Sequence, residues 1–317
     1  MLFRSVGFDL AVTSVLLDAG AGPDWRYCEP SSGTFYARSE GLAVASFDLF
    51  AAGTFSSVST QPLRADATGL ARFDAGKLAF GCQVGASNPM VGLEGRASLL
   101  RSLGSAIAKA PDLFGRDARI GNLVDTLERR AVNRVLPATD ILDAVLAGFG
   151  LVWPGRLSLA GLPLGDTWRH ASARSGDAAD GLVPFHKLSQ WLTYSLVEPL
   201  EWLGLRITGL DDLTGLPEYR NGGLFLDLGV LAWRDPATPD HVWKPGDEPI
   251  VEWRALTVAL LDQVAIAMRE RLGLDAGSLP LAKVLQGGTW TAGRRVASRL
   301  RADGGPPLRL DSDGTVF

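Results

Sequence analysis

Residues 213–223 read LTGLPEYRNGG, and the interpretation of the whole chain starts from this turn. Three glycines and a proline restrict its backbone, yet it contains the triplet Glu218, Tyr219 and Arg220. The pattern resembles a hairpin between two helices, which places Glu218 near the start of the second one. A carboxylate there favours the helix dipole by roughly 0.3–1 kcal/mol. It is also suited to face the positive charge that develops when a glycosidic bond is cleaved.

Long helices are predicted on both sides of the turn. Residues 182–205 carry leucines at helical spacing, and Pro199 either kinks this helix or begins a new one. A further helix is expected through 223–233. Residues 250–272 are apolar on nearly every side, which predicts a central, buried helix.

The remaining sequence is less regular. Residues 150–183 form a long connection rich in Gly, Pro, Asp and Ser, and DTWRHASARSGDAADG (166–181) within it is expected to be an exposed loop. FSSVSTQPL (55–63) is expected to be a loop as well. The helix after residue 86 is expected to begin with Ser87 or Asn88 as its cap and Pro89 in its first turn. Helices are also predicted at 1–19, 121–134 and 139–149, a strand at 77–84, and either form at 42–50. The tail from residue 281 is expected to hold a short helix, a glycine turn, a basic helix and a coil.

These patterns predict a mainly α fold with a small β element near the N-terminal part. We expect a mixed segment, 1–85, packed on a helical part, 86–317, as one compact unit. The composition is that of a soluble globular protein, with 46% hydrophobic and 21% charged residues. A net charge of −4 argues against nucleic-acid and membrane partners.

The sequence has few residues suited to metal binding or disulfide bonds. The two cysteines and three widely spaced histidines form no HExxH or CxxC pattern. We therefore expect no metal and no cofactor. A signal peptide or membrane span is not recognisable, so a cytoplasmic location is expected.

Several residues outside the turn are candidates for ligand binding. Lys187 stands near a helix start, where its charge is unfavourable unless an anion such as phosphate is present, although it could equally be a solvated lysine. Its neighbour His186 is expected to be packed or hydrogen-bonded. Trp25 and Arg26 lie in a glycine-containing turn and could stack on a planar group and hold an anion.

Two further residues begin the helix at 250–272. Glu252 and Arg254 are expected to have supporting roles, and Arg254 is expected to pair with Glu218 or another interior acid. GGTWTAGRR (287–295) lacks the spacing of a P-loop, and FSSVS (55–59) is not a nucleophile elbow. The sequence therefore gives no support to a nucleotide triphosphatase or a serine hydrolase of that type.

Several longer strings resemble one protein family over essentially the whole chain. They are DAGAGPDWRY (18–27), RSEGLAVASF (38–47), PLRADA (62–67), NPMVGLEGR (88–96) and GGPPLRLDSDGTVF (304–317). The family comprises formerly uncharacterised proteins linked to fungal and bacterial uracil catabolism. The resemblance implies a late step in a pathway in which uracil becomes a nucleotide, its ring is opened and urea is released.

A more distant resemblance covers about residues 182–265. FHKLSQ (185–190), PEYRNGG (217–223) and VEWRALTV (251–258) look like three segments of the queuosine-salvage glycosidases. Those enzymes cleave the N-glycosidic bond of a nucleoside 5′-monophosphate and have a helical, DNA-glycosylase-like fold with a helix-hairpin-helix-like turn. The resemblance implies that Glu218 is catalytic.

The same resemblance assigns the neighbouring positions. It implies that Lys187 contacts the substrate phosphate, with His186 beside it. Tyr219 and Arg220 match the two residues after the catalytic aspartate, which implies substrate binding. By the same resemblance, Glu252 and Arg254 correspond to an acidic residue and an arginine on a helix of those glycosidases. Where those enzymes have Asp, this chain has Glu218, so nucleophile, general base and electrostatic stabiliser all stay open for it.

Together the two resemblances imply a metal-independent N-glycosidase that converts urea-ribose phosphate to urea and ribose 5-phosphate. The expected partner is this small phosphorylated riboside. One alternative is a nucleotide-binding or regulatory protein of the pathway without turnover. A second is an amide hydrolase acting on the opened ring through Ser56, Ser57 and a lysine. A DNA repair glycosylase is disfavoured by the net charge.

Overall fold

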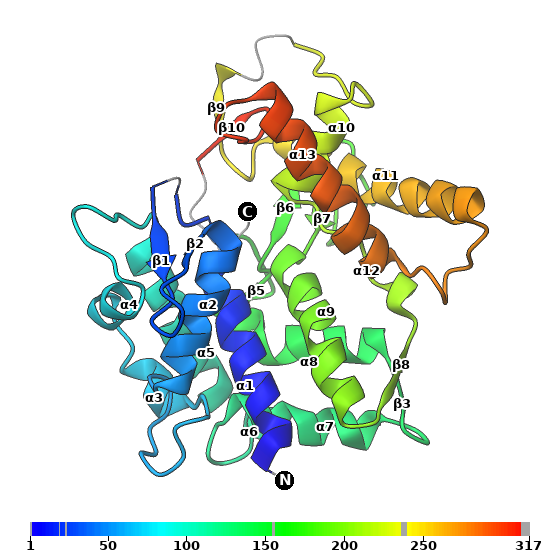
Figure 1. Ribbon diagram of the computed structural model, residues 1–317. Coiled ribbons are helices and arrows are strands. Elements are labelled where there is room, and N and C mark those ends of the chain that lie inside the picture. The colour runs from blue at the N-terminus through cyan, green and yellow to red at the C-terminus, as the bar shows by residue number, and fades with distance from the viewer. Residues whose placement is uncertain (1, 19, 23, 154–155, 236–239, 312–317) are drawn as a thin grey trace. The chain divides into compact units, whose positions relative to one another are not determined.

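The computed structural model describes residues 2–18, 20–22, 24–153, 156–235 and 240–311. Helices dominate these residues, and the strands are two or three residues long and paired two by two, so the mainly α expectation is confirmed (Figure 1). The chain divides into two compact units. The first contains the described residues within 1–155 and 191–208, and the second those within 156–190 and 209–311. The boundary expected at residues 85 and 86 lies inside the first unit.

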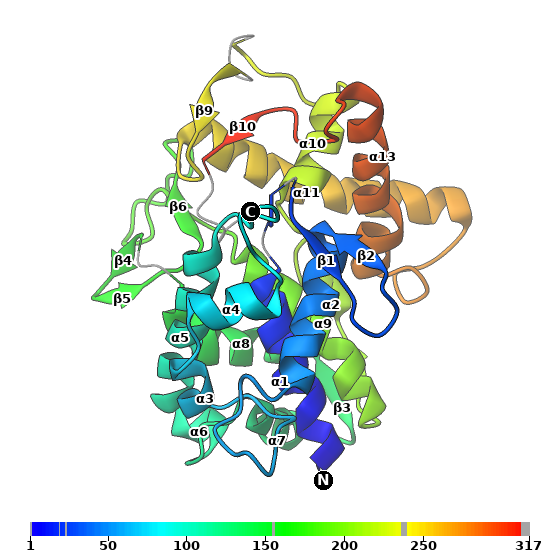
Figure 2. The same ribbon diagram turned by 60° about the vertical axis from the view of Figure 1, so that its left-hand side comes forward.

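The first unit is built around helices that bury apolar stripes. Helices α1 (Leu2–Leu17), α2 (Arg38–Ala51) and α5 (Leu93–Ala108) pack together, and Leu100, Leu103 and Ile107 of α5 are fully buried at helical spacing. The antiparallel hairpin β1 (Arg26–Cys28) and β2 (Phe35–Ala37) packs on α2 (Figure 2). A small β element thus lies near the front of the chain, but at residues that the sequence did not predict as strands.

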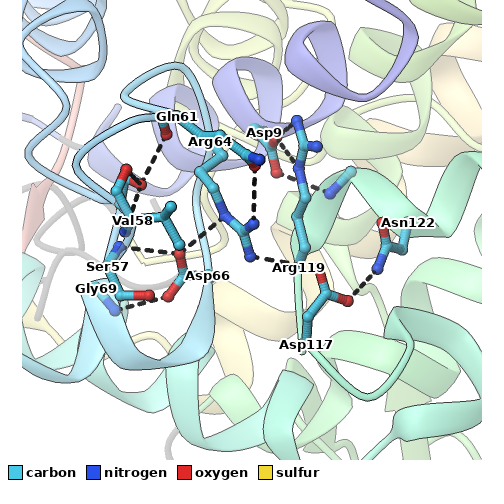
Figure 3. A network of polar contacts seen from close by, with 12 residues as sticks. Asp9, Ser57, Val58, Gln61, Arg64, Asp66, Gly69, Asp117, Arg119 and Asn122 are labelled. Carbon is cyan, nitrogen blue, oxygen red and sulfur yellow. Dashed lines mark hydrogen bonds and ion pairs between the residues drawn. The ribbon is translucent and has the colours of Figure 1, made fainter. Parts of the chain in front are cut away.

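The first unit contains further helices and one pair of parallel strands. They are α3 (Ala67–Ala71), α4 (Ala75–Gly81), α6 (Pro111–Phe114), η1 (Ile120–Asn122), α7 (Leu123–Arg130), α8 (Ala138–Phe149), η2 (Gly150–Val152) and the parallel pair β3 (Val135–Pro137) and β8 (Arg206–Thr208). Ion pairs between charged side chains connect some of these segments. Figure 3 shows Asp9 of α1 facing Arg119, and Arg64 lying beside Asp66, the cap of α3.

Two expectations for the first unit are wrong. Residues 77–84 do not form a strand, because Asp74 caps a helix there by accepting the Lys77 N–H at 2.8 Å. The helix expected from Ser87 or Asn88 begins instead at Leu93, after Gly92 with φ of 74°. Asn88 pairs with the backbone N–H and carbonyl of Arg26, both at 2.8 Å, which removes it from helix capping.

The main helices of the second unit are α10 (Tyr219–Asp227) and α11 (Glu248–Leu272). Helix α13 (Trp290–Leu300) packs on α10, and it follows α12 (Leu281–Lys283) and a π-helix (Val284–Thr289) without a break. The strands form three pairs: β4 (Ser158–Leu159) with β5 (Leu162–Pro163), β6 (Thr167–Arg169) with β7 (Leu182–Pro184), and β9 (Val242–Trp243) with β10 (Arg309–Leu310). The 3₁₀ turn η3 (Leu210–Asp212) precedes the turn at 213–218.

Helix α9 (Lys187–Trp202) continues through Pro199, and its residues fall in both units. Lys187, Leu188, Ser189 and Gln190 belong to the second unit, whereas Trp191–Trp202 belong to the first. The helix expected over 182–205 is therefore confirmed with a later start, since Leu182–Pro184 form β7.

Four expectations for the second unit need correction. Residues 166–181 are not all exposed loop, because Thr167–Arg169 pair with Leu182–Pro184. Helix α10 ends at Asp227 rather than running through residue 233. The helix at 250–272 is not buried on all sides, since Leu256, Ile266 and Leu272 are exposed. The glycine turn expected at 287–288 lies within the π-helix.

Candidate functional site

Glu218 closes the turn at 213–218 and caps α10. Its extended backbone (φ −118°, ψ 169°) lets the carboxylate fold back onto the first turn of the helix. The two oxygens accept the N–H groups of Arg220 and Asn221, each at 2.7 Å. This is the helix-start position expected from the sequence, and the local reason is side-chain capping of orphan N–H groups.

Burial changes the acidity of Glu218. The residue is 6% exposed, and burial raises the pKa of its carboxyl group above the ordinary value. The two backbone N–H groups and the charges of Lys187 and Arg220 oppose this rise without cancelling it. A carboxyl group of this kind is easier to protonate than one in water, which suits it to exchange a proton during a reaction.

Lys187 provides a buried positive charge in the same unit. It is the first residue of α9 and is 3% exposed, so the expectation of a solvated lysine is wrong. Its positive charge works against the rise in the pKa of the Glu218 carboxyl group. The preceding His186 has a left-handed backbone (φ 47°) and a pKa lowered by burial.

Asp166 and Arg254 form a buried ion pair beside these residues. The two terminal guanidinium nitrogens of Arg254 each lie 2.8 Å from one carboxylate oxygen of Asp166. The pKa of Asp166 is lowered, because the attraction of Arg254 and the hydrogen bonds outweigh the effect of burial. The expectation that Arg254 pairs with an interior acid is confirmed, and that acid is Asp166.

Close packing fixes α10 against two neighbouring helices. A Cβ at Gly222 would lie 2.6 Å from the Trp253 ring of α11, and one at Gly293 of α13 would lie 2.4 Å from the Arg220 carbonyl. The Asn221 side chain accepts the Thr289 hydroxyl at 2.8 Å and donates to the Leu216 carbonyl at 3.1 Å. Asn and Gly at positions 221 and 222 are therefore explained by packing and hydrogen bonding around the turn.

The other candidates have different surroundings. Arg220 is buried, donates to the Gly304 carbonyl at 2.8 Å and lies over the half-buried Tyr219 ring. Glu252 has a 45% exposed side chain that lies 3.9 Å from Arg234, on a different side of α11 from Arg254. The structure thus brings Lys187, Glu218 and Arg254 into one buried cluster and leaves Glu252 out of it.

Trp25 and Arg26 belong to the first unit. The Trp25 ring is fully buried, and its indole N–H donates to the Cys82 carbonyl at 2.9 Å. Arg26 is exposed and donates to the Trp25 carbonyl. Their predicted role in substrate binding stays a prediction.

Sequence reasoning missed Asp166. It lies at the start of a segment whose composition indicates an exposed loop, and its partner Arg254 is 88 residues away. The nearest signal is Trp168, because aromatic residues are uncommon in solvated loops. The indole N–H of Trp168 donates to Asp166 at 2.7 Å.

Two features of the described residues concern metals and membranes. No three side chains of His, Cys, Asp or Glu among them are grouped so as to hold a metal ion. Within the same residues, no helix combines the length and apolar character needed to cross a bilayer.

Comparisons with known proteins agree over nearly the full chain. It is 42% identical to Uracil catabolism protein 4 of Lachancea kluyveri over 337 aligned residues, covering 98% of this chain and 76% of that protein. It is also 42% identical to Protein urg3 of Schizosaccharomyces pombe (strain 972 / ATCC 24843) over 315 residues, covering 98% of this chain and 74% of that protein. The family model described as "Protein of unknown function (DUF1688)" matches residues 4–317. The chain belongs to this DUF1688 family.

Proposed function

We propose that this protein acts in uracil catabolism as a hydrolase of the N-glycosidic bond in a ribose 5-phosphate derivative. The substrate that fits best is urea-ribose phosphate, which would give urea and ribose 5-phosphate. The name of the relative from Lachancea kluyveri supports the pathway. The single observation that carries the chemistry is the buried Glu218 carboxyl group, held by two backbone N–H groups and close enough to Lys187 to sense its charge.

The proposed reaction breaks one bond and forms one. The bond between C1 of the ribose and the urea nitrogen breaks, and its electron pair stays on the nitrogen. A water oxygen bonds to C1, and the water's protons end on the urea nitrogen and the new hydroxyl group. Glu218 stabilises the oxocarbenium-like transition state and accepts the proton of the attacking water before it is passed on. The reaction needs no metal and no redox cofactor.

Lys187 is assigned to the phosphate end of the substrate. Its ammonium group, on the buried first residue of the 16-residue helix α9, supplies the positive charge that pairs with the phosphate. Holding the phosphate fixes the ribose relative to Glu218, and positioning of this kind supplies a large part of enzymatic rate enhancement. His186, Tyr219 and Arg220 flank these two residues and are proposed to contact the substrate.

The finer fold assignment belongs to the same proposal. The turn at 213–218, followed directly by α10 with a capping carboxylate, supports a helix-hairpin-helix-like turn of the DNA-glycosylase type. We assign the protein a small phosphorylated riboside as substrate and a cytoplasmic location.

One observation favours a second candidate function. Both oxygens of Glu218 are engaged in capping α10, so the carboxylate has a structural role even without chemistry. A nucleotide-binding or regulatory protein would keep the same cap and bind the riboside without turnover.

The test is release of reducing sugar from a panel of 5′-phosphorylated ribosides, including ribosylurea phosphate and UMP. We expect release from ribosylurea phosphate, at least a 100-fold lower rate in Glu218→Gln, and an unchanged rate in Glu270→Gln, which alters an exposed carboxylate of the same unit. Glu218→Asp separates capping from catalysis, because Asp is among the best helix caps. It should keep the thermal stability of the wild type while the rate falls, since the carboxylate is one methylene shorter. Binding of ribosylurea phosphate without sugar release would favour the regulatory protein instead.

A further inference from the structure

The carboxylate of Asp166 has all of its hydrogen-bond acceptor positions occupied. Besides the two nitrogens of Arg254, Asp166 accepts the Lys187 N–H at 3.0 Å and the indole N–H of Trp168 at 2.7 Å. A carboxylate offers about four acceptor positions, and these four donors fill them. Asp166 is thus committed to holding other groups and is unsuited to accept a proton from a substrate.

Arg254 reaches both chain segments that carry the proposed functional residues. Its Nε donates to the carbonyl of Pro217, the residue before Glu218, at 3.2 Å. Its guanidinium group lies 4.1 Å from the ring centre of Phe185, two residues before Lys187. The backbone carbonyl of Asp166 also accepts the Phe185 N–H at 2.9 Å. The ion pair therefore connects the start of α9 with the turn before α10.

We infer that Asp166 and Arg254 are a positioning pair that sets the placement of Lys187 relative to Glu218. Both members of the pair are buried, with Arg254 only 1% exposed. Stability alone is a weak reason for such a pair, because well-packed apolar residues of similar volume are often as stable. The catalytic consequence rests on the proposed function: a shift of about 1 Å between the two groups can lower a rate about 100-fold.

The first test compares Arg254→Lys with Arg269→Lys. Both arginines lie on α11, each pairs with an Asp, and each donates from Nε to a backbone carbonyl, which for Arg269 is that of Leu279. Lysine keeps the charge but cannot make the two-pronged pair. We expect kcat for sugar release to fall 10- to 100-fold in Arg254→Lys with KM within threefold. The Arg269→Lys variant should keep both constants.

A second variant guards against loss of folding. Breaking one partner of a buried ion pair is strongly destabilising, whereas replacing both by apolar residues often is not. The double variant Asp166→Leu/Arg254→Met should therefore fold, as judged by its thermal unfolding, and still show the lower kcat. If the pair has only a structural role, this folded variant will have the wild-type kcat.

Hydrogen exchange measures the geometry without using activity. The N–H groups of Arg220 and Asn221 are bonded to Glu218 and not to the ion pair, so their exchange rates report how firmly Glu218 is held. We expect exchange at least 10-fold faster in both Arg254 variants and unchanged in Arg269→Lys. Unchanged exchange in the folded double variant overturns the inference. Absence of sugar release by the wild type overturns the proposed function alone, and exchange then decides the positioning role.

Discussion

At the scale of single residues, the second unit contains several buried charged side chains. Asp166, Lys187, Glu218, Arg220 and Arg254 are each 7% exposed or less. Charges are rarely buried unless they are paired and hydrogen-bonded, because removing them from water is costly. Asp166 and Arg254 meet this condition completely. Glu218 meets it with two backbone donors, yet burial still raises its pKa, so these partners do not fully offset the removal from water.

The first unit has its own perturbed carboxyl group, Asp9. It is fully buried, and burial raises its pKa to about 7 despite Arg119, at 2.7 Å, and the Gly121 N–H, also at 2.7 Å (Figure 3). The folded protein therefore binds more protons than the unfolded chain between about pH 4 and pH 7. Asp9 contributes stability below pH 4, and this contribution is lost as the pH rises to 7.

The Asp9→Asn variant tests this pH dependence, because Asn cannot titrate. The unfolding free energy of the variant minus that of the wild type should increase by on the order of 3 kcal/mol between pH 4 and pH 7.5. Urea unfolding at several pH values measures it, and other titrating groups cancel in the difference. A difference that is constant with pH would contradict the raised pKa.

Part of the site could be predicted at this scale. The glycines and proline around Glu218 indicated a helix start, and the structure has it as the cap of α10. Arg254 was expected to pair with an interior acid, since a charged residue amid an apolar helix requires a partner. Asp166 could not be identified, because its contacts are fixed by the fold over 88 residues and its local composition is that of a loop.

At the scale of elements, the contact between α10 and α11 depends on a glycine. A Cβ at Gly222 would lie 2.6 Å from Trp253 and 2.7 Å from the Thr257 hydroxyl, both on α11. Gly222→Ala should therefore destabilise the protein by about 1–3 kcal/mol through overpacking. The matched control is Gly287→Ala in the π-helix, where an added Cβ meets no atom within 4 Å.

Thermal unfolding of the two alanine variants checks this account. Gly287→Ala should be neutral or up to about 1 kcal/mol more stable, because alanine restricts the unfolded chain without strain. An equal effect of both substitutions on the melting temperature would mean that the close approach at Gly222 is not what holds α10 on α11.

Elements with a long apolar period were predictable, and short ones were not. The helices at the N-terminus and at 139–149 appear as α1 and α8, because their stripes are long enough to define a period. The apolar run at 77–84 fits a strand or a helix equally well, and the Asp74 cap decides for the helix. The exposed side of α11 was missed because several of its exposed positions, among them Leu256 and Ile266, are apolar.

At the scale of the whole molecule, the two units interleave along the chain. Residues 191–208 belong to the first unit although they follow 35 residues of the second, Arg156–Gln190. Composition is a local property of the sequence, so it can indicate a boundary between neighbouring segments. It cannot indicate that a later segment packs with an earlier one to form one unit. The expected boundary near residue 85 followed such a change and has no counterpart in the division into units.

The central claim concerns which bond the protein breaks. The most direct measurement is a carbon NMR spectrum of ribosylurea 5-phosphate labelled with ¹³C at C1, recorded during incubation with the protein. We predict that the C1 signal moves to the positions of the two anomers of ribose 5-phosphate with the wild type, and that it stays in place with Glu218→Gln. If the urea group is altered while the chemical shift of C1 still indicates a bond to nitrogen, the protein is an amide hydrolase and not an N-glycosidase. An unchanged spectrum with the wild type would contradict any hydrolase of this compound.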